Sequence, residues 1–268
     1  MQQNHLATQS SIKTAVPAVE QASRVLFCLG TSPLSKLRLT DICDQVGISK
    51  SKGHSILNTL KQFELVDQDS QAKTYSLGPA LIFLSQRVLA NLNYPDVVAP
   101  FLENLVSETN GTAAFGLVSG SHVFIIAKHE GNQQIAIRLP LGHRFHITLG
   151  AHGKAIAAFM DEDEREKLFE KKNLHFYGEA SPRNLKRLRA EMAQCRAQGF
   201  AQDAGEITPG VNVVSAPVFG VGDRIVGCVI LIGTFPASQV REYGPKAANA
   251  AKQISRKLGA NVQALFSN

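Results

Sequence analysis

Five of the chain's eight histidines are concentrated in one short stretch, at His122, His129, His143, His146 and His152. Neutral imidazoles bind zinc, and His143-x-x-His146 together with His152 supplies three of them. The spacing matches no standard zinc motif, and histidines on strand ends and loops more often serve as polar surface or ligand-binding groups. We therefore expect no bound metal and no cofactor. We place His146 or His152 beside an acidic ligand instead.

Two carboxylates, Asp203 and Glu206, could perform general acid–base catalysis with these histidines. This is the alternative hypothesis: an enzyme that converts a small molecule in the C-terminal part of the chain. The sequence contains no G-x-S-x-G, H-E-x-x-H or nucleotide-binding fingerprint. An enzyme would also leave residues 39–77 without a role. We therefore expect a protein that is not an enzyme.

The segment LGAHGKAIAAF, residues 149–159, is a glycine-rich loop that opens a helix. The N–H groups of Gly150, Ala151 and His152 are placed to bind a carboxylate, helped by the helix dipole. The alternative is a tight loop whose glycines only relieve steric crowding. A nucleotide P-loop is excluded, because Ala155 follows Lys154 where a magnesium-binding Ser or Thr is required.

A second functional pattern is LTDICDQVGISKSKGHSILNTL, residues 39–60. It predicts two short helices joined at Gly47, which can adopt the left-handed conformation that a sharp turn needs. Thr40 and Ser49 are the expected N-caps of these helices. The second helix begins with small, polar and basic residues, Lys50 and Lys52 among them, which suits contact with phosphates and base edges. The alternative is an ordinary solvated helix start.

The elements around this pattern favour a winged helix-turn-helix domain. Val19, Ala22, Leu26 and Leu29 predict a preceding helix ended by Gly30 and Pro33. The buried face expected for the third helix is Ile56, Leu57, Leu60 and Phe63. Residues 65–77 then predict a hairpin, the wing, with Tyr75 and Leu77 on one face. The DNA-contacting residues we expect are Thr40, Ser49, Lys50, Ser51, Lys52, His54, Ser55, Asn58, Lys73 and Tyr75.

Composition sets wide limits on function. The chain has 268 residues, a formal net charge of +6 and a pI of about 9.2, which is compatible with an acidic partner. Residues 1–15 carry no apolar block, so we expect a disordered tail rather than a signal peptide. Four scattered cysteines favour a reduced, cytoplasmic location, and the longest apolar run, 225–232, is too short to cross a membrane as a helix.

Three blocks in this order resemble the IclR family of bacterial transcriptional regulators, from Val16 onward. They are AVPAVEQASRVLFCL with LTDICDQVGISKSKGHSILNTLKQFELV, then LGHRFHITLGAHGKAIAAF, then GFAQDAGEITPGVNVVSAPVF with DRIVGCVILIG. The resemblance implies an α+β fold: a winged helix-turn-helix domain (16–77), a linker helix (78–93) and a GAF-like α/β effector-binding domain with an antiparallel sheet (94–268). It further implies pairing of subunits into a homodimer or homotetramer, with the linker helix contributing.

This sequence departs from the family pattern in the third helix. Where the family commonly has Ser-Thr-Val-His-Arg, the chain has Ser51-Lys52-Gly53-His54-Ser55. Ser55 in place of arginine removes one phosphate or base contact, and Lys52 restores a charge. Gly53 costs about 1 kcal/mol of helix stability, or permits a close approach to the backbone. We therefore expect an operator that differs from those of better-known relatives.

Relatives bind small organic acids at the positions of Gly150 and Ala151, with an acidic residue at the position of Asp203. Members that bind two- and three-carbon keto acids have small polar residues near Val213, Ile230 and Ile232. Because these three are apolar here, we expect an aromatic or otherwise apolar acid. The alternative is a register shift by one residue, which would turn both isoleucines into the core. The expected effector-binding residues are His146, Gly150, Ala151, His152, Asp203, Val213, Ile230 and Ile232.

The rest of the C-terminal part alternates between helices and strands. We expect a helix over 95–109, two strands around Ser119-Gly120-Ser121, a third strand over 133–142, and a basic helix opened by Ser181 and Pro182. A hairpin over 213–233 and an amphipathic helix over 237–258 follow. The expected function is a ligand-responsive DNA-binding regulator of a catabolic operon. The sequence leaves open the effector, the target genes, repression versus activation, and dimer versus tetramer.

Overall fold

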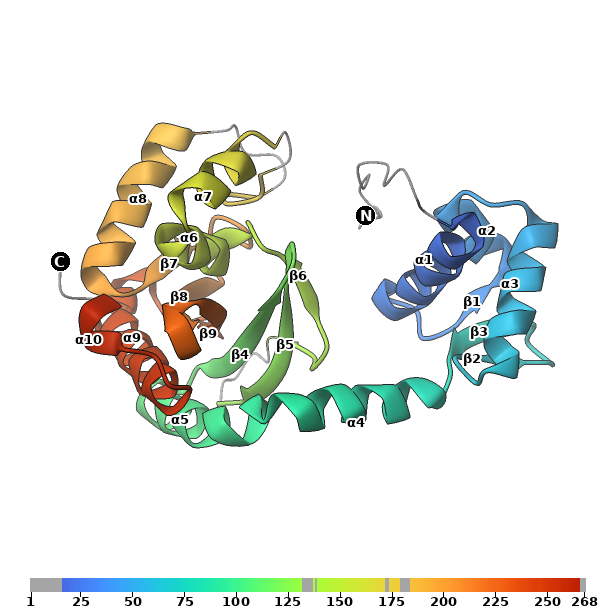
Figure 1. Ribbon diagram of the computed structural model, residues 1–268, viewed down its shortest axis with the longest axis horizontal. Coiled ribbons are helices and arrows are strands. Elements are labelled where there is room, and N and C mark those ends of the chain that lie inside the picture. The colour runs from blue at the N-terminus through green and yellow to red at the C-terminus, as the bar shows by residue number, and fades with distance from the viewer. Residues whose placement is uncertain (1–15, 132–136, 138, 172–173, 179–183, 266–268) are drawn as a thin grey trace. The chain divides into compact units, whose positions relative to one another are not determined.

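The computed structural model describes residues 16–131, 137, 139–171, 174–178 and 184–265 (Figure 1). The chain divides into two compact units, Met1–Asn91 and Leu92–Asn268. The expected tail over residues 1–15, and residues 133–136, 138, 181 and 182, lie outside the described residues. The strand expected over 133–142 is wrong over 137 and 139–142, the half that the structure describes, because these residues are not in a strand. The basic helix begins at Leu185, where the Asn184 side chain accepts the Arg187 N–H, and not at Ser181.

The first unit is built on three helices, α1 (Pro17–Thr31), α2 (Leu39–Val46) and α3 (Lys50–Gln62). Gly47 ends α2 with φ +74° and ψ +43°, so the predicted left-handed turn between α2 and α3 is confirmed. The three helices share one core that includes Val25, Ile42 and Leu57, each fully buried. These contacts fix how α3 is presented to solvent.

A three-stranded antiparallel sheet completes this unit, with β1 (Leu37–Arg38), β2 (Val66–Asp69) and β3 (Thr74–Leu77) in the order β1-β3-β2. The β2–β3 hairpin is the predicted wing, and Val66 pairs with Leu77 at its base. The helix α4 (Ala80–Leu92) follows. It exposes four large apolar side chains to solvent, at Ile82, Phe83, Leu84 and Val88.

Several predictions of detail in this unit are wrong. Helix α1 ends at Thr31, between Gly30 and Pro33 as expected, but Val19 of its expected apolar face is 63% exposed. Thr40 lies inside α2, which begins after Arg38; the Arg38 N–H donates to the Asp41 carboxylate at 3.2 Å. Phe63, expected on the buried face of the third helix, is 67% exposed.

The second unit is organised around a six-stranded antiparallel sheet in the order β6-β5-β4-β9-β8-β7. Its strands are β4 (Thr112–Ser119), β5 (His122–His129), β6 (Arg144–His146), β7 (Ala201–Ala204), β8 (Asn212–Phe219) and β9 (Ile225–Gly233). The β8–β9 hairpin pairs Val213 with Ile232 and Ser215 with Ile230. These four residues therefore share one face of the sheet, and their neighbours occupy the other.

Helices cover both faces of this sheet (Figure 1). On one face, α5 (Tyr94–Thr109) and α9 (Val240–Lys257) enclose the main core, which includes Phe115, Val229 and Leu231. On the other, α6 (Gly150–Phe159) packs against β7, β8 and β9, and α8 (Leu185–Gln198) packs against α6. The remaining elements are α7 (Glu162–Phe169), α10 (Val262–Leu265) and 3-10 turns at Val221–Asp223 and Ala237–Gln239.

The predicted α+β class, with a winged helix-turn-helix unit followed by an α/β unit on an antiparallel sheet, is confirmed. The sequence did not predict α7. Among the described residues, no helix has the length and apolar character that a membrane span requires.

Candidate DNA-reading surface and effector pocket

Helix α3 presents a polar face opposite its buried face. At 100° per residue, Ser51, His54, Ser55 and Asn58 cluster on one side, while Gly53, Leu57 and Leu60 are buried on the other. Lys50 and Lys52 fall on the two edges of the polar face. The helix therefore carries a row of neutral hydrogen-bonding side chains between two exposed positive charges.

The predicted N-cap of α3 is present. The Ser49 side chain accepts a hydrogen bond from the Lys52 N–H at 3.4 Å. Further along the exposed face, the Asn58 amide lies 3.2 Å from His54 Nδ1, and the Ser55 hydroxyl donates to the Ser51 carbonyl at 3.1 Å. The Ser55 hydroxyl and the Asn58 amide are thus held in place along the helix in the absence of DNA.

Gly53 has a packing role inside the domain. A Cβ atom at this position would lie 2.3 Å from the Cys43 sulfur of α2. The glycine thus lets α3 approach α2 closely, and it does not face the polar surface. The close approach that Gly53 permits is therefore to the Cys43 side chain of α2, and not to a backbone as expected from the sequence.

Two residues expected to contact DNA occupy other environments. Tyr75 is only 4% exposed, and its hydroxyl accepts a hydrogen bond from the Gln68 amide at 3.1 Å within the core of the first unit. Thr40 is half-buried in the first turn of α2. Lys73, at the tip of the wing with φ +53°, is exposed. The exposed candidates are therefore Lys73 and the residues of α3 with its cap.

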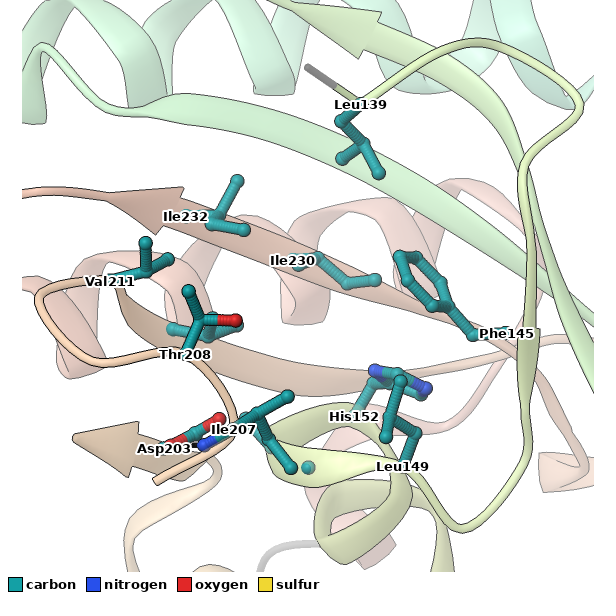
Figure 2. A pocket seen from close by; sticks show the side chains of 13 residues that line it. Leu139, Phe145, Leu149, His152, Asp203, Ile207, Thr208, Val211, Ile230 and Ile232 are labelled. Carbon is teal, nitrogen blue, oxygen red and sulfur yellow. Dashed lines mark hydrogen bonds between the residues drawn. The ribbon is translucent and has the colours of Figure 1, made fainter. Parts of the chain in front are cut away.

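The second unit contains a cavity of about 140 Å³ between α6 and the sheet (Figure 2). Seven of the eight residues expected to bind an effector line it: Gly150, Ala151, His152, Asp203, Val213, Ile230 and Ile232. Val229 and Leu231 lie in the main core on the other face of β9. The alternative of a one-residue register shift is therefore excluded.

Sequence reasoning missed six further lining residues: Leu139, Phe145, Leu149, Ile207, Thr208 and Val211. Figure 2 shows Phe145 directed toward Ile230 and His152 from the β6 side of the cavity. Four of the six are large apolar side chains, so they add to the apolar character of the wall. Strand alternation along β6 could have identified Phe145 as a lining residue. Its side chain must face opposite to those of Arg144 and His146.

The glycines of α6 solve steric problems and also shape the cavity. Gly150 has φ +51°, and its missing Cβ would lie 3.5 Å from Asp203 Oδ2. At Gly153 a Cβ would lie 2.4 Å from the carbonyl carbon of Thr148. The first intrahelical bond runs from the Gly153 N–H to the Leu149 carbonyl at 2.9 Å. The Ala151 and His152 N–H groups precede it and belong to the donors that a helix start leaves unpaired.

Asp203 and His152 set the charge of the cavity. Asp203 is 2% exposed, and burial raises the pKa of its carboxyl despite hydrogen bonds from the Glu206 and Ile207 N–H groups at 2.7 and 3.4 Å. Burial lowers the pKa of His152 to about 4, and its Nε2 donates to the His146 carbonyl at 3.3 Å. At neutral pH the imidazole in the wall is therefore uncharged.

His146 does not line the cavity, so its expected side-chain contact with an effector is not supported. Because Phe145 points into the cavity, the next residue on β6 points to the opposite face. His146 Nδ1 lies 2.7 Å from the Thr148 hydroxyl, and its ring packs edge-on against His175, with centroids 5.1 Å apart. The His146 carbonyl accepts the hydrogen bond from His152 and holds that ring in place.

Two further histidines of the stretch, His122 and His143, are not among the residues that line the cavity. His143 packs against Phe145 with ring centroids 4.4 Å apart, and His122 pairs with His146 across β5 and β6. Within the residues that the structure describes, no three His, Cys, Asp or Glu side chains form a group that would hold a metal ion.

The two carboxylates of the enzyme alternative are engaged in structural contacts. Asp203 accepts the main-chain N–H groups of the loop that follows it. Glu206 forms ion pairs with Lys154, at 3.1 Å, and with Arg187. Neither arrangement presents a catalytic dyad with a histidine, and the geometry favours ligand binding.

A winged helix-turn-helix unit joined to an α/β unit with a pocket between α6 and the sheet defines a ligand-responsive DNA-binding regulator. Models of two domains match this chain: the IclR helix-turn-helix domain over residues 18–70, and the bacterial transcriptional regulator IclR C-terminal domain over residues 86–258. The chain belongs to the IclR family of bacterial transcriptional regulators.

Similar proteins support this assignment. The chain is 27% identical over 247 residues to the HTH-type transcriptional regulator XynR of Escherichia coli K12, covering 91% of this chain and 98% of that protein. An IclR transcriptional regulator from Alicyclobacillus acidocaldarius has a similar structure, with a TM-score of 0.78, 25% identity, and coverage of 94% of this chain and 100% of that one. An IclR homologue from Microbacterium hydrocarbonoxydans, solved with 4-hydroxybenzoate, shares the fold at a TM-score of 0.75 and 16% identity, over 90% and 98% of the two chains.

Proposed function

We propose that this regulator binds a short, roughly palindromic operator through α3 and responds to a small apolar organic acid. The observation that carries the DNA part is the polar face of α3 between Lys50 and Lys52. Lysines at the edges of a helix in the major groove meet phosphates, while Asn58, His54 and the two serines face base edges. The regulated genes would form a catabolic operon, and the protein would act in the cytoplasm, where that DNA lies.

The size and lining of the cavity support the effector class. A cavity of about 150 Å³ lined by Leu, Ile and Phe is enough to bind benzene, and this one measures about 140 Å³. We assign the carboxylate of the ligand to the Ala151 and His152 N–H groups and its apolar body to Ile230, Ile232 and Phe145. The 4-hydroxybenzoate in the Microbacterium structure is an aromatic acid of the proposed class.

Pairing of two copies follows from the way such helices read DNA. Two recognition helices of a symmetric dimer bind the half-sites of a palindrome. The exposed apolar side chains of α4, at Ile82, Phe83, Leu84 and Val88, support pairing of this helix with that of a second copy. An effector would then regulate DNA binding by having different affinities for the DNA-competent and DNA-incompetent states.

The first test titrates the protein with DNA from upstream of its own gene, against random DNA of equal length, at two salt concentrations. We expect preferential binding that weakens steeply with salt. Lys50→Ala should weaken binding several-fold and reduce the slope of log K against log salt by about 0.9, because one phosphate contact is lost.

The control for this test is Lys246→Ala, which removes the same charge from α9 in the second unit. It should bind the operator like the parent. Equal salt slopes for Lys50→Ala and the parent would contradict the assignment of Lys50, and no binding to any DNA would overturn the proposed function.

A second test concerns the pocket. Ile232→Ser should weaken binding of benzoate, 4-hydroxybenzoate or a branched-chain keto acid by roughly tenfold and favour pyruvate relative to the parent, since a hydroxyl replaces an apolar wall. Operator binding should be unchanged. Isothermal titration calorimetry with these four acids measures the ranking.

Ile126→Ser makes the same substitution on β5, at a half-buried residue that packs toward the main core. This variant should keep the ligand ranking of the parent. If Ile232→Ser also kept that ranking, the assignment of the cavity as the effector site would be wrong.

A further inference from the structure

A group of charged residues lies behind the wall of the pocket and is not among its lining residues. Its centre is Lys154 of α6, which is only 2% exposed. The Lys154 ammonium lies 2.9 Å from Glu191 and 3.1 Å from Glu206, and it donates to the Gln202 carbonyl at 3.2 Å. We call Lys154, Tyr177, Arg187, Glu191 and Glu206 the Lys154 cluster.

The cluster is fully partnered. Lys154 Nζ and Arg187 Cζ lie 4.4 and 4.2 Å from the centre of the Tyr177 ring, so both cations contact the same aromatic side chain. The Tyr177 hydroxyl donates to Glu191 at 3.1 Å, and Arg187 donates to Glu191 at 2.7 Å and to Glu206. The buried charge of Lys154 is tolerated because it has these partners, and removing one of them is costly, whereas the Arg187 side chain is 47% exposed.

Glu206 connects this cluster to the pocket. It follows Gly205 in the loop between β7 and β8, and the next residue, Ile207, lines the cavity. On the pocket side, Asp203 accepts the N–H groups of Glu206 and Ile207. On the other side, the Glu206 carboxylate is held by Lys154 and Arg187. Burial opposes the ionisation of Glu206, but these two cations outweigh it and hold the pKa of the carboxyl below its usual range.

The segment 204–211 depends on these contacts for its position. Gly205 and Gly210 both have positive φ, at +75° and +81°, and Thr208, Pro209 and Gly210 are exposed. Three of its residues, Ile207, Thr208 and Val211, line the cavity. The loop is bounded by two glycines and anchored by the carboxylates of Asp203 and Glu206, so release of Glu206 leaves only the Asp203 anchor and lets the loop move more freely.

We propose that Lys154 and Arg187 are positioning residues of the effector site, which act through Glu206 to hold segment 204–211 against the cavity. Neither cation lines the cavity. Only the consequence for effector binding rests on the proposed function; the restraint on the segment is a property of the protein without a ligand.

Hydrogen–deuterium exchange of the full-length protein, without any ligand, tests this directly. Glu206→Gln keeps the shape of the side chain but removes the charge that both cations hold. We expect the amide N–H groups of segment 204–211 (Pro209 has none) to exchange about tenfold faster, while those of β9 keep the parent rate. Arg187→Gln should have the same effect, and Arg187→Lys, which keeps the charge, should restore slow exchange in large part.

The matched control is Arg189→Gln on the same helix, since Arg189 pairs with Glu166 at 2.8 Å. It should leave segment 204–211 unchanged. Parent-like exchange of this segment in Glu206→Gln would overturn the proposal. Faster exchange throughout β8 and β9 would also overturn it, because the cluster would then be a general stabiliser. The absence of any acid-dependent DNA binding would instead count against the proposed function alone.

Discussion

Gly153→Ala is expected to lower the free energy of unfolding of the second unit by about 3 kcal/mol or more. The new Cβ would lie 2.4 Å from the Thr148 carbonyl carbon and 2.7 Å from its oxygen. Both are backbone atoms next to the first turn of α6, so no flexible side chain can move aside. Relief requires a shift of that turn, which carries the Ala151 and His152 N–H groups. Effector affinity should therefore fall by more than tenfold.

Urea unfolding followed by circular dichroism measures the stability change. Gly120→Ala is the control, because Gly120 has φ +56° in the β4–β5 turn and nothing within 4 Å of an added Cβ. The Gly120→Ala variant measures only the cost of holding an alanine in the left-handed backbone conformation, about 1–2 kcal/mol. A Gly153→Ala cost no larger than that of Gly120→Ala would show that the turn adapts, and would contradict steric crowding as the role of Gly153.

Features that depend on residue type or on the alternation of side chains along a strand could be predicted from the sequence. The turn at Gly47 and the cap at Ser49 follow from residue types with strong backbone preferences, and both are present. The two isoleucines of β9 reach the cavity because strand alternation is strict once the register is fixed. The same rule, applied to β6, would have removed His146 from the site and added Phe145.

Features that depend on tertiary packing were not predictable from the sequence. Tyr75 is an amphipathic residue that suits a wing surface or a core, and only the pairing of β1 with β3 places it inside. Lys154 sits in a helix whose other residues from Gly150 to Ala158 are also buried. A lysine in such a helix signals a buried acidic partner. Its partners, Glu191 and Glu206, are distant in the sequence, so the sequence alone does not identify which acidic residues pair with Lys154.

His152 should make the second unit sensitive to acid. Its pKa in the folded protein is held at about 4 by burial first, with the charge of His146 adding, against an ordinary value of 6.5. The unfolded chain binds this proton as the pH falls below about 6.5, and the folded chain does not. The stabilisation is thus fully present above that pH and is lost progressively between pH 6.5 and 4. The total is about 3 kcal/mol.

Replacing His152 by glutamine should remove most of this dependence, because the amide keeps a hydrogen-bond donor but does not titrate. Urea unfolding between pH 4 and 7 gives the slope of stability against pH for parent and variant. Burial also lowers the pKa of His122 and His143, so a smaller slope of the same sign should remain. His54→Gln on α3 controls for the loss of one exposed histidine outside the pocket. A His152→Gln slope equal to that of the parent would mean that the buried imidazole accepts a proton without unfolding, and that the pocket can hold a positive charge for its acid ligand.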